Sequence, residues 1–235
     1  MNICNIDIEI VKKDIKNLHI GVYPPNGRVR VATPLYMSDE AIRVAIINRL
    51  SWLKREIKNF KEQPRESKRE MISGESHYFL GKRYLLDVIC DSKRHFVVLK
   101  HSKIELHIQK TTTSENRYKL LQEWYRKELH GIISKFIDKW EKQIDQNINN
   151  WQIKKMKTKW GSCNIEKKSI IFNLYLARVP IECIEYIVVH EMVHLLERNH
   201  NENFKFYMDR FLPDWQNRKE LLGNFILTYE EWKNI

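Results

Sequence analysis

Glycine, proline and cysteine are all scarce in this chain, whose 235 residues include 7 Gly, 6 Pro and 4 Cys. So little Gly and Pro, together with 43% hydrophobic residues, excludes a linker-rich or disordered chain and indicates an ordered globular protein. The cysteines form no C-x-x-C pair, so neither a zinc knuckle nor a disulfide framework is expected. They are Cys4, Cys90, Cys163 and Cys183, and we expect them to be reduced.

Long hydrophobic runs are also missing. No stretch reaches the roughly 18 consecutive apolar residues that a membrane-spanning helix needs. The first seven residues, MNICNID, lack the basic start and apolar centre of a signal peptide. These absences predict a cytoplasmic protein without a membrane partner.

Negative charge is in deficit, with 30 Asp and Glu against 41 Lys and Arg, which gives a formal net charge of +11. Such an excess favours anionic partners, of which nucleic acid is the obvious one. The basic residues are spread widely, however, and no nucleic-acid fold signature accompanies them. A solvated basic surface is therefore the simpler interpretation, and nucleic acid remains an alternative partner.

The most informative motif that is present is H-E-x-x-H at residues 190–194. On a helix, His190 and His194 lie on one face with their Cβ atoms about 5–6 Å apart. Both imidazoles can then bind one zinc ion at about 2.0–2.1 Å. Glu191 is rotated by about 100° and stands beside the metal, where a general base can take a proton from a zinc-bound water.

The surroundings of this motif favour a buried helix. Pro180 suits a first helical position, and an apolar stripe follows it. The stripe consists of Ile184, Ile187, Val188 and Leu195. A solvated helix face that merely carries two histidines and a glutamate would not have apolar flanks, so we predict a zinc site.

The third ligand is less clear from the sequence. His200 follows His194 by six residues, and on a continued helix it would face away from the metal. The helix must therefore stop near Glu197–Asn199 and turn back, with Asn199 tolerating a left-handed conformation. The spacing matches the metzincin pattern, but Glu197 stands where metzincins carry glycine. The competing ligands are the downstream carboxylates Asp209, Asp214 and Glu220.

Apolar periodicity predicts an α+β fold. Alternating residues indicate strands at 3–11, 18–23, 28–32, 78–80, 83–90, 96–99 and 104–108. Helical spacing indicates long helices over 39–61 and 115–147, the second packing under the H-E-x-x-H helix. Strands at 151–158 and 169–176 are expected around a loop at 161–168. The histidines His77, His95, His101 and His107 are interpreted as surface residues.

Two parts are expected along the chain. Residues 1–110 form a β-rich N-terminal part with one long helix. Residues 111–235 form a zincin-like part in which the H-E-x-x-H helix lies next to a β-hairpin, and both parts are expected to make one continuous unit.

Several blocks of the second part resemble a known family. They are KTKWGSC at 157–163, NLYL at 173–176, Pro180, YIVVHE at 186–191, Asn199-His200, Phe204 and PDW at 213–215. These blocks look like the YgjP-like zinc metallopeptidases, and the resemblance is specific over residues 151–222. It implies a zinc peptidase related to the SprT-like and minigluzincin groups. It also implies His190, His194 and His200 as ligands of one zinc ion, and Glu191 as the catalytic base.

The resemblance also points to substrate-binding residues. It places the segment around 160–163 and the strand 170–175 where an extended substrate pairs with a zinc peptidase, main chain to main chain. The candidates are Trp160, Gly161, Ser162 and Asn173, with plain packing as the alternative for Trp160. Asn173 could instead orient a metal ligand by a hydrogen bond, or be an ordinary polar residue at a strand end. Tyr207 and Arg218 are candidates for stabilising the oxyanion.

Two functional hypotheses follow from the sequence. The first is a zinc-dependent endopeptidase acting on protein or peptide substrates, with activity blocked by a chelator. The second is a basic module that binds nucleic acid or nucleoprotein, with a structural or vestigial zinc site. A steep salt dependence of nucleic-acid binding would support the second hypothesis.

Overall fold

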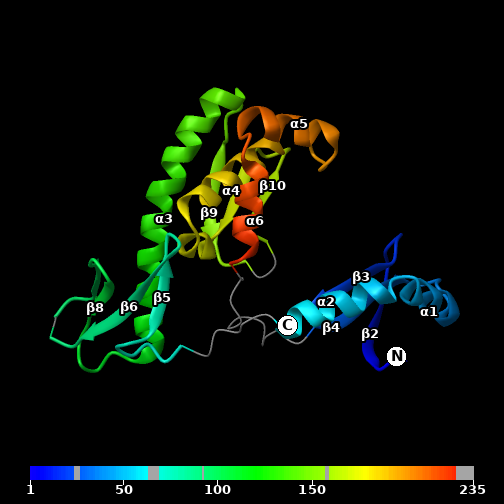
Figure 1. The fold of residues 1–235 in the computed structure, drawn as a ribbon, viewed down its shortest axis with the longest axis horizontal. Coiled ribbons are helices and arrows are strands. Elements are labelled where there is room, and N and C mark those ends of the chain that lie inside the picture. The colour runs from blue at the N-terminus through cyan, green and yellow to red at the C-terminus, as the bar shows by residue number, and fades with distance from the viewer. Residues whose placement is uncertain (24–26, 63–68, 92, 157–158, 226–235) are drawn as a thin grey trace. The chain divides into compact units, whose positions relative to one another are not determined.

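The computed structural model describes residues 1–23, 27–62, 69–91, 93–156 and 159–225 (Figure 1). The chain forms two compact units: of the described residues, those up to Glu62 belong to the first and those from Arg69 to Phe225 belong to the second. The boundary thus differs from the predicted one at residue 110. The reason is that buried residues before residue 110, such as Leu86 and Ile104, share one core with buried residues of the later helices.

The first unit is a four-stranded sheet followed by two helices. Its elements are β1 (Asn2–Ile3), β2 (Ile6–Lys13), β3 (His19–Tyr23), β4 (Arg28–Pro34), α1 (Asp39–Ile47) and α2 (Leu50–Glu62). The single helix predicted over 39–61 is broken after Ile47. There the Asn48 N–H still donates to Val44 O, while the Arg49 N–H closes a tight turn on Ile46 O at 3.0 Å. Asn is a weak helix former, which fits a break at this position.

The second unit begins with another four-stranded sheet. Its strands are β5 (Ser76–Phe79), β6 (Lys82–Ile89), β7 (Phe96–Leu99) and β8 (Lys103–His107). The strand order is β5-β6-β8-β7, the same as β1-β2-β4-β3 in the first unit. In both sheets the outer pairs are antiparallel and the central pair is parallel. The chain therefore contains one four-stranded arrangement twice, each followed by a helix with a hydroxyl N-cap, Ser38 or Thr113.

One histidine of this sheet is not where the sequence predicted it. His77 was expected on the surface, but its side chain is only 2% exposed. The Glu75 carboxylate lies 3.3 Å from His77 Nε2, so the buried ring has a polar partner. Burial of His77 is therefore compatible with its polarity, and the surface prediction was wrong.

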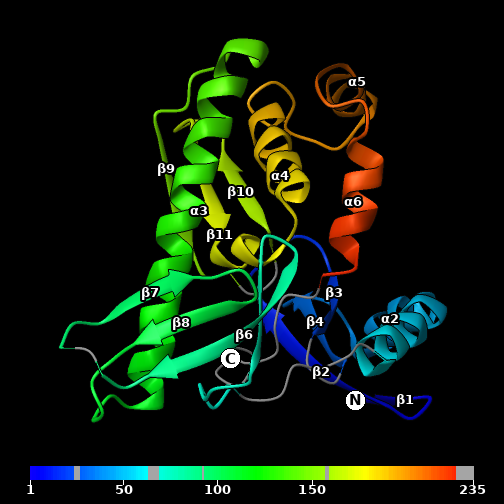
Figure 2. The ribbon, with the colours of Figure 1, turned by 60° about the vertical axis from the view of Figure 1, so that its left-hand side comes forward.

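The long helix α3 (Ser114–Ile144) agrees with the predicted helix over 115–147. It contacts α4 (Ile181–Val193), the 3-10 helix η1 (Leu174–Arg178) and β7, and Figure 2 shows the course of α3 beside these elements. Ile132 and Phe136 follow the helical spacing that predicts this helix, but they are only partly buried. Ile133 and Ile137 occupy the buried positions instead.

The remaining elements surround the H-E-x-x-H motif. They are β9 (Asn150–Lys154), β10 (Gly161–Asn164), β11 (Ser169–Asn173), α4 (Ile181–Val193), α5 (Glu202–Phe211) and α6 (Trp215–Gly223). Residues 161–164 were expected in a loop but form the edge strand β10, antiparallel to β11. β9 pairs with β11 in parallel, not as a hairpin partner. Residues 157–158, at the end of the predicted strand 151–158, lie outside the described residues.

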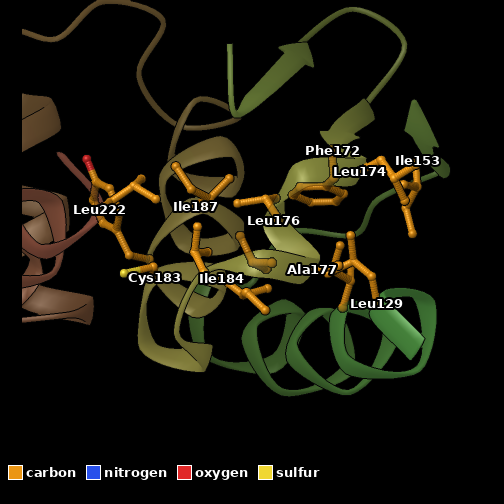
Figure 3. Packing of buried hydrophobic residues seen from close by; sticks show 14 of the residues in the cluster. Leu129, Ile153, Phe172, Leu174, Leu176, Ala177, Cys183, Ile184, Ile187 and Leu222 are labelled. Carbon is orange, nitrogen blue, oxygen red and sulfur yellow. The ribbon is translucent and has the colours of Figure 1, made fainter. Parts of the chain in front are cut away.

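Buried side chains from these elements fill one continuous core (Figure 3). Leu129 of α3, Phe172 of β11 and Leu176 of η1 meet Ile184 and Ile187 of α4 there, with Leu222 of α6 at the edge. The protein is thus a mixed α+β fold whose core fixes the position of α4. Among the described helices, none combines the length and the apolar character that a membrane span requires.

Candidate metal centre

Helix α4 is held at both ends, beginning with its N-terminus at Pro180. The turn between β5 and β6 lies against this residue, because Gly81 has a φ of +78° and a Cβ there would lie 2.7 Å from Pro180 Cγ. The Gly81 N–H also donates to Arg178 O at 3.1 Å. Only glycine tolerates both this φ and this close approach. The first residues of α4 are therefore fixed by the neighbouring sheet.

The other end of α4 lies one turn earlier than predicted. The helix ends at Val193 rather than near Glu197–Asn199, and His194 is its C-cap. The Leu195 N–H then donates to Met192 O at 3.0 Å, which tightens the last turn. The chain reverses over residues 194–201 and re-enters a helix after Asn201, the N-cap of α5.

A carboxylate organises this reversal, not a left-handed residue. Asn199 does not belong to the described residues with a positive φ, so that expectation was wrong. Glu197 Oε1 instead accepts a hydrogen bond from the Asn199 N–H at 3.0 Å. The backbone of Asn199 and then the side chains of Asn201 and Asn203 lower the pKa of Glu197. The residue that departs from the metzincin glycine thus stabilises the turn by accepting hydrogen bonds.

The reversal brings His200 back to the two histidines of α4. One side-chain nitrogen from each of His190, His194 and His200 lies within 4.8 Å of the others. His190 Nε2 and His200 Nε2 are 3.0 Å apart. Two nitrogens bound to one tetrahedral zinc at about 2.0–2.1 Å would be about 3.4 Å apart. The three rings therefore fit a single ion with a fourth position left open.

Hydrogen bonds and packing orient the rings. His194 Nδ1 lies 3.1 Å from Glu197 O, and a carbonyl can only accept, so Nδ1 carries the hydrogen and Nε2 keeps its lone pair. His190 Nδ1 is buried and has no hydrogen-bond partner in the described structure. The buried ring of Phe204 lies 4.6–5.0 Å from all three imidazoles, centroid to centroid. Phe204 therefore forms the apolar floor on which the histidines rest.

Burial keeps His190 and His194 neutral. It lowers the pKa of His190 to about 3, with repulsion from His194 and His200 acting in the same direction. It also lowers the pKa of His194. Neutral imidazole is the form that binds a metal ion, so protons do not compete for these nitrogens near neutral pH.

Glu191 is buried beside this cluster, with 5% of its side chain exposed. Its carboxylate lies against the backbone of β10, where a Cβ on Gly161 would be 2.5 Å from Glu191 Oε1. Burial raises the pKa of Glu191 to about 8, opposed by the charge of Lys159 and by a hydrogen bond from the Cys163 backbone. A carboxyl with such a pKa can exchange a proton near neutral pH.

A cleft of about 750 Å³ opens over the histidines. One wall is residues 159–166, which include the edge strand β10, and the other wall comes from α4 and α6. The α4–α6 wall is formed by Tyr186, Ile187, Lys219, Leu222 and Gly223. Within its sheet β10 pairs only with β11, so its second edge is unpaired there. An extended peptide can add to such an edge.

The predicted substrate residues divide into two groups. Trp160, Gly161 and Ser162 line the cleft. Asn173 is fully buried, and its Nδ2 donates to Met156 O and Lys159 O at 2.7 Å each. Asn173 thus anchors the segment that leads into the cleft wall. Its described hydrogen bonds join it to backbone groups and not to a histidine, and Asn173 does not line the cleft.

The two oxyanion candidates do not line the cleft either. The ring of Tyr207 stacks on Phe211, with centroids 6.2 Å apart. The guanidinium of Arg218 donates to Glu185 Oε2 at 2.7 Å and to Asp214 Oδ2 at 2.8 Å. The ion pairs of Arg218 hold α6 against α4, which explains why this cation does not reach the histidines.

The competing metal ligands are also accounted for. Asp209 accepts a hydrogen bond from Trp215 Nε1 at 2.7 Å, and Asp214 is paired with Arg218. Among the described residues, the cluster able to hold a metal contains the three histidines and no carboxylate. Sequence reasoning missed three cleft cations, Lys159, Arg198 and Lys219. Nothing in the sequence distinguishes them from the other lysines and arginines.

The profile of the YgjP-like, metallopeptidase domain matches residues 16–225. The crystal structure of the metallopeptidase zymogen of Pyrococcus abyssi abylysin is similar at 16% identity and a TM-score of 0.34, over 38% of this chain and 87% of that chain. The zymogen of Methanocaldococcus jannaschii jannalysin is similar at 22% identity and a TM-score of 0.34, over 42% and 97%. No curated protein matches.

Proposed function

This chain belongs to the YgjP-like metallopeptidase family, and we propose that it is a zinc-dependent endopeptidase whose metal is held by His190, His194 and His200. The observation that carries the proposal is the convergence of three imidazole nitrogens beside a buried carboxylate at the base of an open cleft. Three neutral nitrogen ligands with an open fourth position are typical of catalytic zinc. Peptides and proteins are the substrates of a metallopeptidase.

The three histidines form the proposed zinc-binding site. His194 is fixed in one tautomer by Glu197 O, and all three rings rest on Phe204. Because the rings are already oriented, little further ordering is needed when the ion binds. A bound zinc ion supplies Lewis acidity, which polarises the scissile carbonyl and lowers the pKa of a water in the open position.

Glu191 is the proposed general base. Its carboxylate takes the proton of the attacking water and passes it to the leaving amine. The Cys163 backbone and the close approach of Gly161 hold the carboxylate in one place. A cation held by the three histidines would favour the ionised form of Glu191, which is the form that accepts the proton.

The substrate is proposed to lie along β10. Main-chain pairing with the unpaired edge of this strand would hold the peptide extended, and Trp160, Gly161 and Ser162 would border it. Residues 111–235 then form the proposed catalytic part, which includes all the residues that line the cleft.

The function is tested by digestion of denatured proteins with zinc-loaded protein, with mass spectrometry to find the cleavage sites. We expect cleavage that a chelator abolishes. Glu191→Gln should keep its zinc, because the carboxylate is outside the histidine cluster, but lose a factor of about 10²–10⁴ in rate. Glu123→Gln, an exposed position on α3, is the matched control.

Two results would count against the assignment. Cleavage by Glu191→Gln at the parental rate would remove Glu191 as the base. Loss of zinc from this variant would make Glu191 a ligand instead.

A further inference from the structure

The α6 face that borders the cleft carries an unusual combination of residues. Lys219, Leu222 and Gly223 all line the cleft, and their spacing places them on one side of the helix. A Cβ added to Gly223 would meet no atom within 4 Å, so there is open space next to this residue. One wall of the cleft is therefore apolar and roomy, with a single lysine on it.

Arg218 and Lys219 are neighbouring basic residues of α6 that differ in their polar contacts. Arg218 is held by Glu185 and Asp214 and also donates to Glu182 O. Among the described residues, no carboxylate lies within ion-pair distance of Lys219, which is exposed. Lys219 is thus a cleft cation without an acidic partner in the described part of the chain.

Aromatic packing directs the Lys219 side chain. Its Nζ lies 5.7 Å from the centroid of the Trp215 ring, within the range of a cation–π contact. Trp215 is itself held by the hydrogen bond from its Nε1 to Asp209 and by stacking on Tyr186, with centroids 6.5 Å apart. The ammonium is therefore carried on a fixed aromatic platform, unlike a freely rotating surface lysine.

Positive side chains outnumber negative ones among the residues that line the cleft. Lys159, Arg198 and Lys219 line it, against the carboxylates Glu166 and Glu191. Lys219 and His190 line the same cleft. A metal ion would add further positive charge. Anionic groups of a substrate are therefore favoured in this cleft.

We propose that Lys219 forms a subsite for a carboxylate of the substrate next to the scissile bond, so that acidic peptide segments are preferred. The inference rests on the proposed function and specifies its substrate class. The carboxylate can belong to an Asp or Glu side chain or to a free C-terminus, and Lys219 recognises both by the same ion pair. Leu222 and the space at Gly223 receive the apolar part of that residue.

The test uses the zinc-loaded protein and fluorogenic peptides that differ only at the positions flanking the scissile bond, where they carry Glu, Gln or Lys. Each peptide is made with a free and with an amidated C-terminus. We expect kcat/KM for the Glu peptides to exceed that for the Gln peptides by about three- to tenfold, mainly through KM. Dependence on the free C-terminus instead of the Glu side chain would identify a terminal carboxylate as the ligand.

Variants of Lys219 separate this role from a general one. Lys219→Met should abolish the Glu preference, Lys219→Arg should retain it, and Lys219→Glu should shift it towards the Lys peptides. Lys127→Met, an exposed position on α3 with the same loss of charge, should keep the preference. Equal cleavage of Glu and Gln peptides by the parental protein, with no difference between free and amidated C-termini, would overturn the proposal. So would a fall in kcat for every peptide in Lys219→Met, because that result indicates oxyanion stabilisation.

Binding provides a readout that does not need catalysis. Fluorescence anisotropy of the same peptides with zinc-loaded Glu191→Gln protein should show the Glu preference, and Glu191→Gln/Lys219→Met should lack it. If the parental protein cleaves no peptide but binding retains this preference, the proposed function fails while the carboxylate subsite stands. If cleavage occurs without any preference in rate or binding, the subsite alone fails.

Discussion

The backbone of Gly161 and the carboxylate of Glu191 occupy adjoining space, with no room for a side chain between them. A Cβ on Gly161 would lie 2.5 Å from Glu191 Oε1, 2.6 Å from its Cγ and 2.8 Å from its Cδ. Gly161 lies on β10 and Glu191 on α4, so this contact joins the strand to the helix at the cleft. The glycine is required by close approach, since it is not among the residues with a positive φ.

Gly161→Ala should therefore displace the carboxylate without touching the histidines. We expect full zinc content and a fall in hydrolysis of roughly 10²-fold or more, because a base moved out of reach of its proton loses most of its effect. Elemental analysis and peptide cleavage measure the two quantities. Gly131→Ala on α3 is the control, because a Cβ there meets nothing within 4 Å. Cleavage by Gly161→Ala at the control rate would show that the position of Glu191 does not matter.

The third ligand can be tested by zinc content. His200→Ala should lose most of its zinc during dialysis against a mild chelator, because only two imidazoles would remain. Asp209→Ala, Asp214→Ala and Glu220→Ala should keep theirs, since none of these carboxylates belongs to the cluster. Zinc retained by His200→Ala and lost from one carboxylate variant would assign the third position to that carboxylate.

The metal-free protein should become less stable as the pH rises above about 6.5, because of Glu191. Its pKa is raised from 4.5 to about 8 in the folded chain, so between these values the folded state binds more protons than the unfolded state. The contribution of Glu191 to the free energy of unfolding should therefore fall from about pH 5 to about pH 8, by a few kcal/mol at most, since each pKa unit corresponds to about 1.36 kcal/mol. The lowered pKa values of His190 and His194 act in the opposite direction below about pH 6.5, so the net fall is expected above that pH. Urea unfolding of metal-free protein measures this change.

Glu191→Gln removes the titrating group and is the comparison for that experiment. The stability advantage of this variant over the parental protein should grow with pH across the same window. Glu123→Gln, which is exposed, should show no such trend. A parallel pH dependence of the parental and Glu191→Gln proteins would mean that the carboxyl ionises normally.

Nucleic-acid binding is expected to be weak and non-specific despite the net charge of +11. Binding that depends on dispersed lysines and arginines should be indifferent to sequence and largely lost at about 200 mM salt. Titration of labelled single- and double-stranded DNA and RNA at two salt concentrations tests this. A complex that survives the higher salt for one form only would support the binding-module hypothesis.

Local sequence patterns predicted much of the fold and part of the candidate site. Apolar spacing located α3 and the strands β5 to β8, and the H-E-x-x-H spacing placed His190 and Glu191 on one buried helix. A reversal after the helix was predicted as the condition for His200 to join them, and the structure brings the three rings together. Their role as zinc ligands stays a prediction, as does the cytoplasmic location.

Other features depend on contacts that a sequence pattern does not encode. The reversal after α4 relies on the Glu197 carboxylate, although a left-handed Asn199 was expected to make the turn. Which of Arg218 and Lys219 lines the cleft depends on how α6 is rotated against α4. The ion pair between Arg218 and Glu185 fixes this rotation. β9 and β11 pair in parallel although β10 lies between them in the chain, so no local sequence pattern predicts this pairing.

The repeated four-stranded arrangement has a consequence for the order of folding. In each sheet the last two strands, β3–β4 and β7–β8, are antiparallel neighbours along the chain and can form as local hairpins. The central pairs β2–β4 and β6–β8 are parallel, so each must wait until the intervening segment has closed into a loop. Completion of each sheet at its centre is therefore expected to be slow compared with hairpin formation. The N–H groups of Leu80 and Gly81, in a turn of the second sheet, also donate hydrogen bonds to η1, just before α4 begins. The cleft over the three histidines should therefore reach its final form only after that slow step.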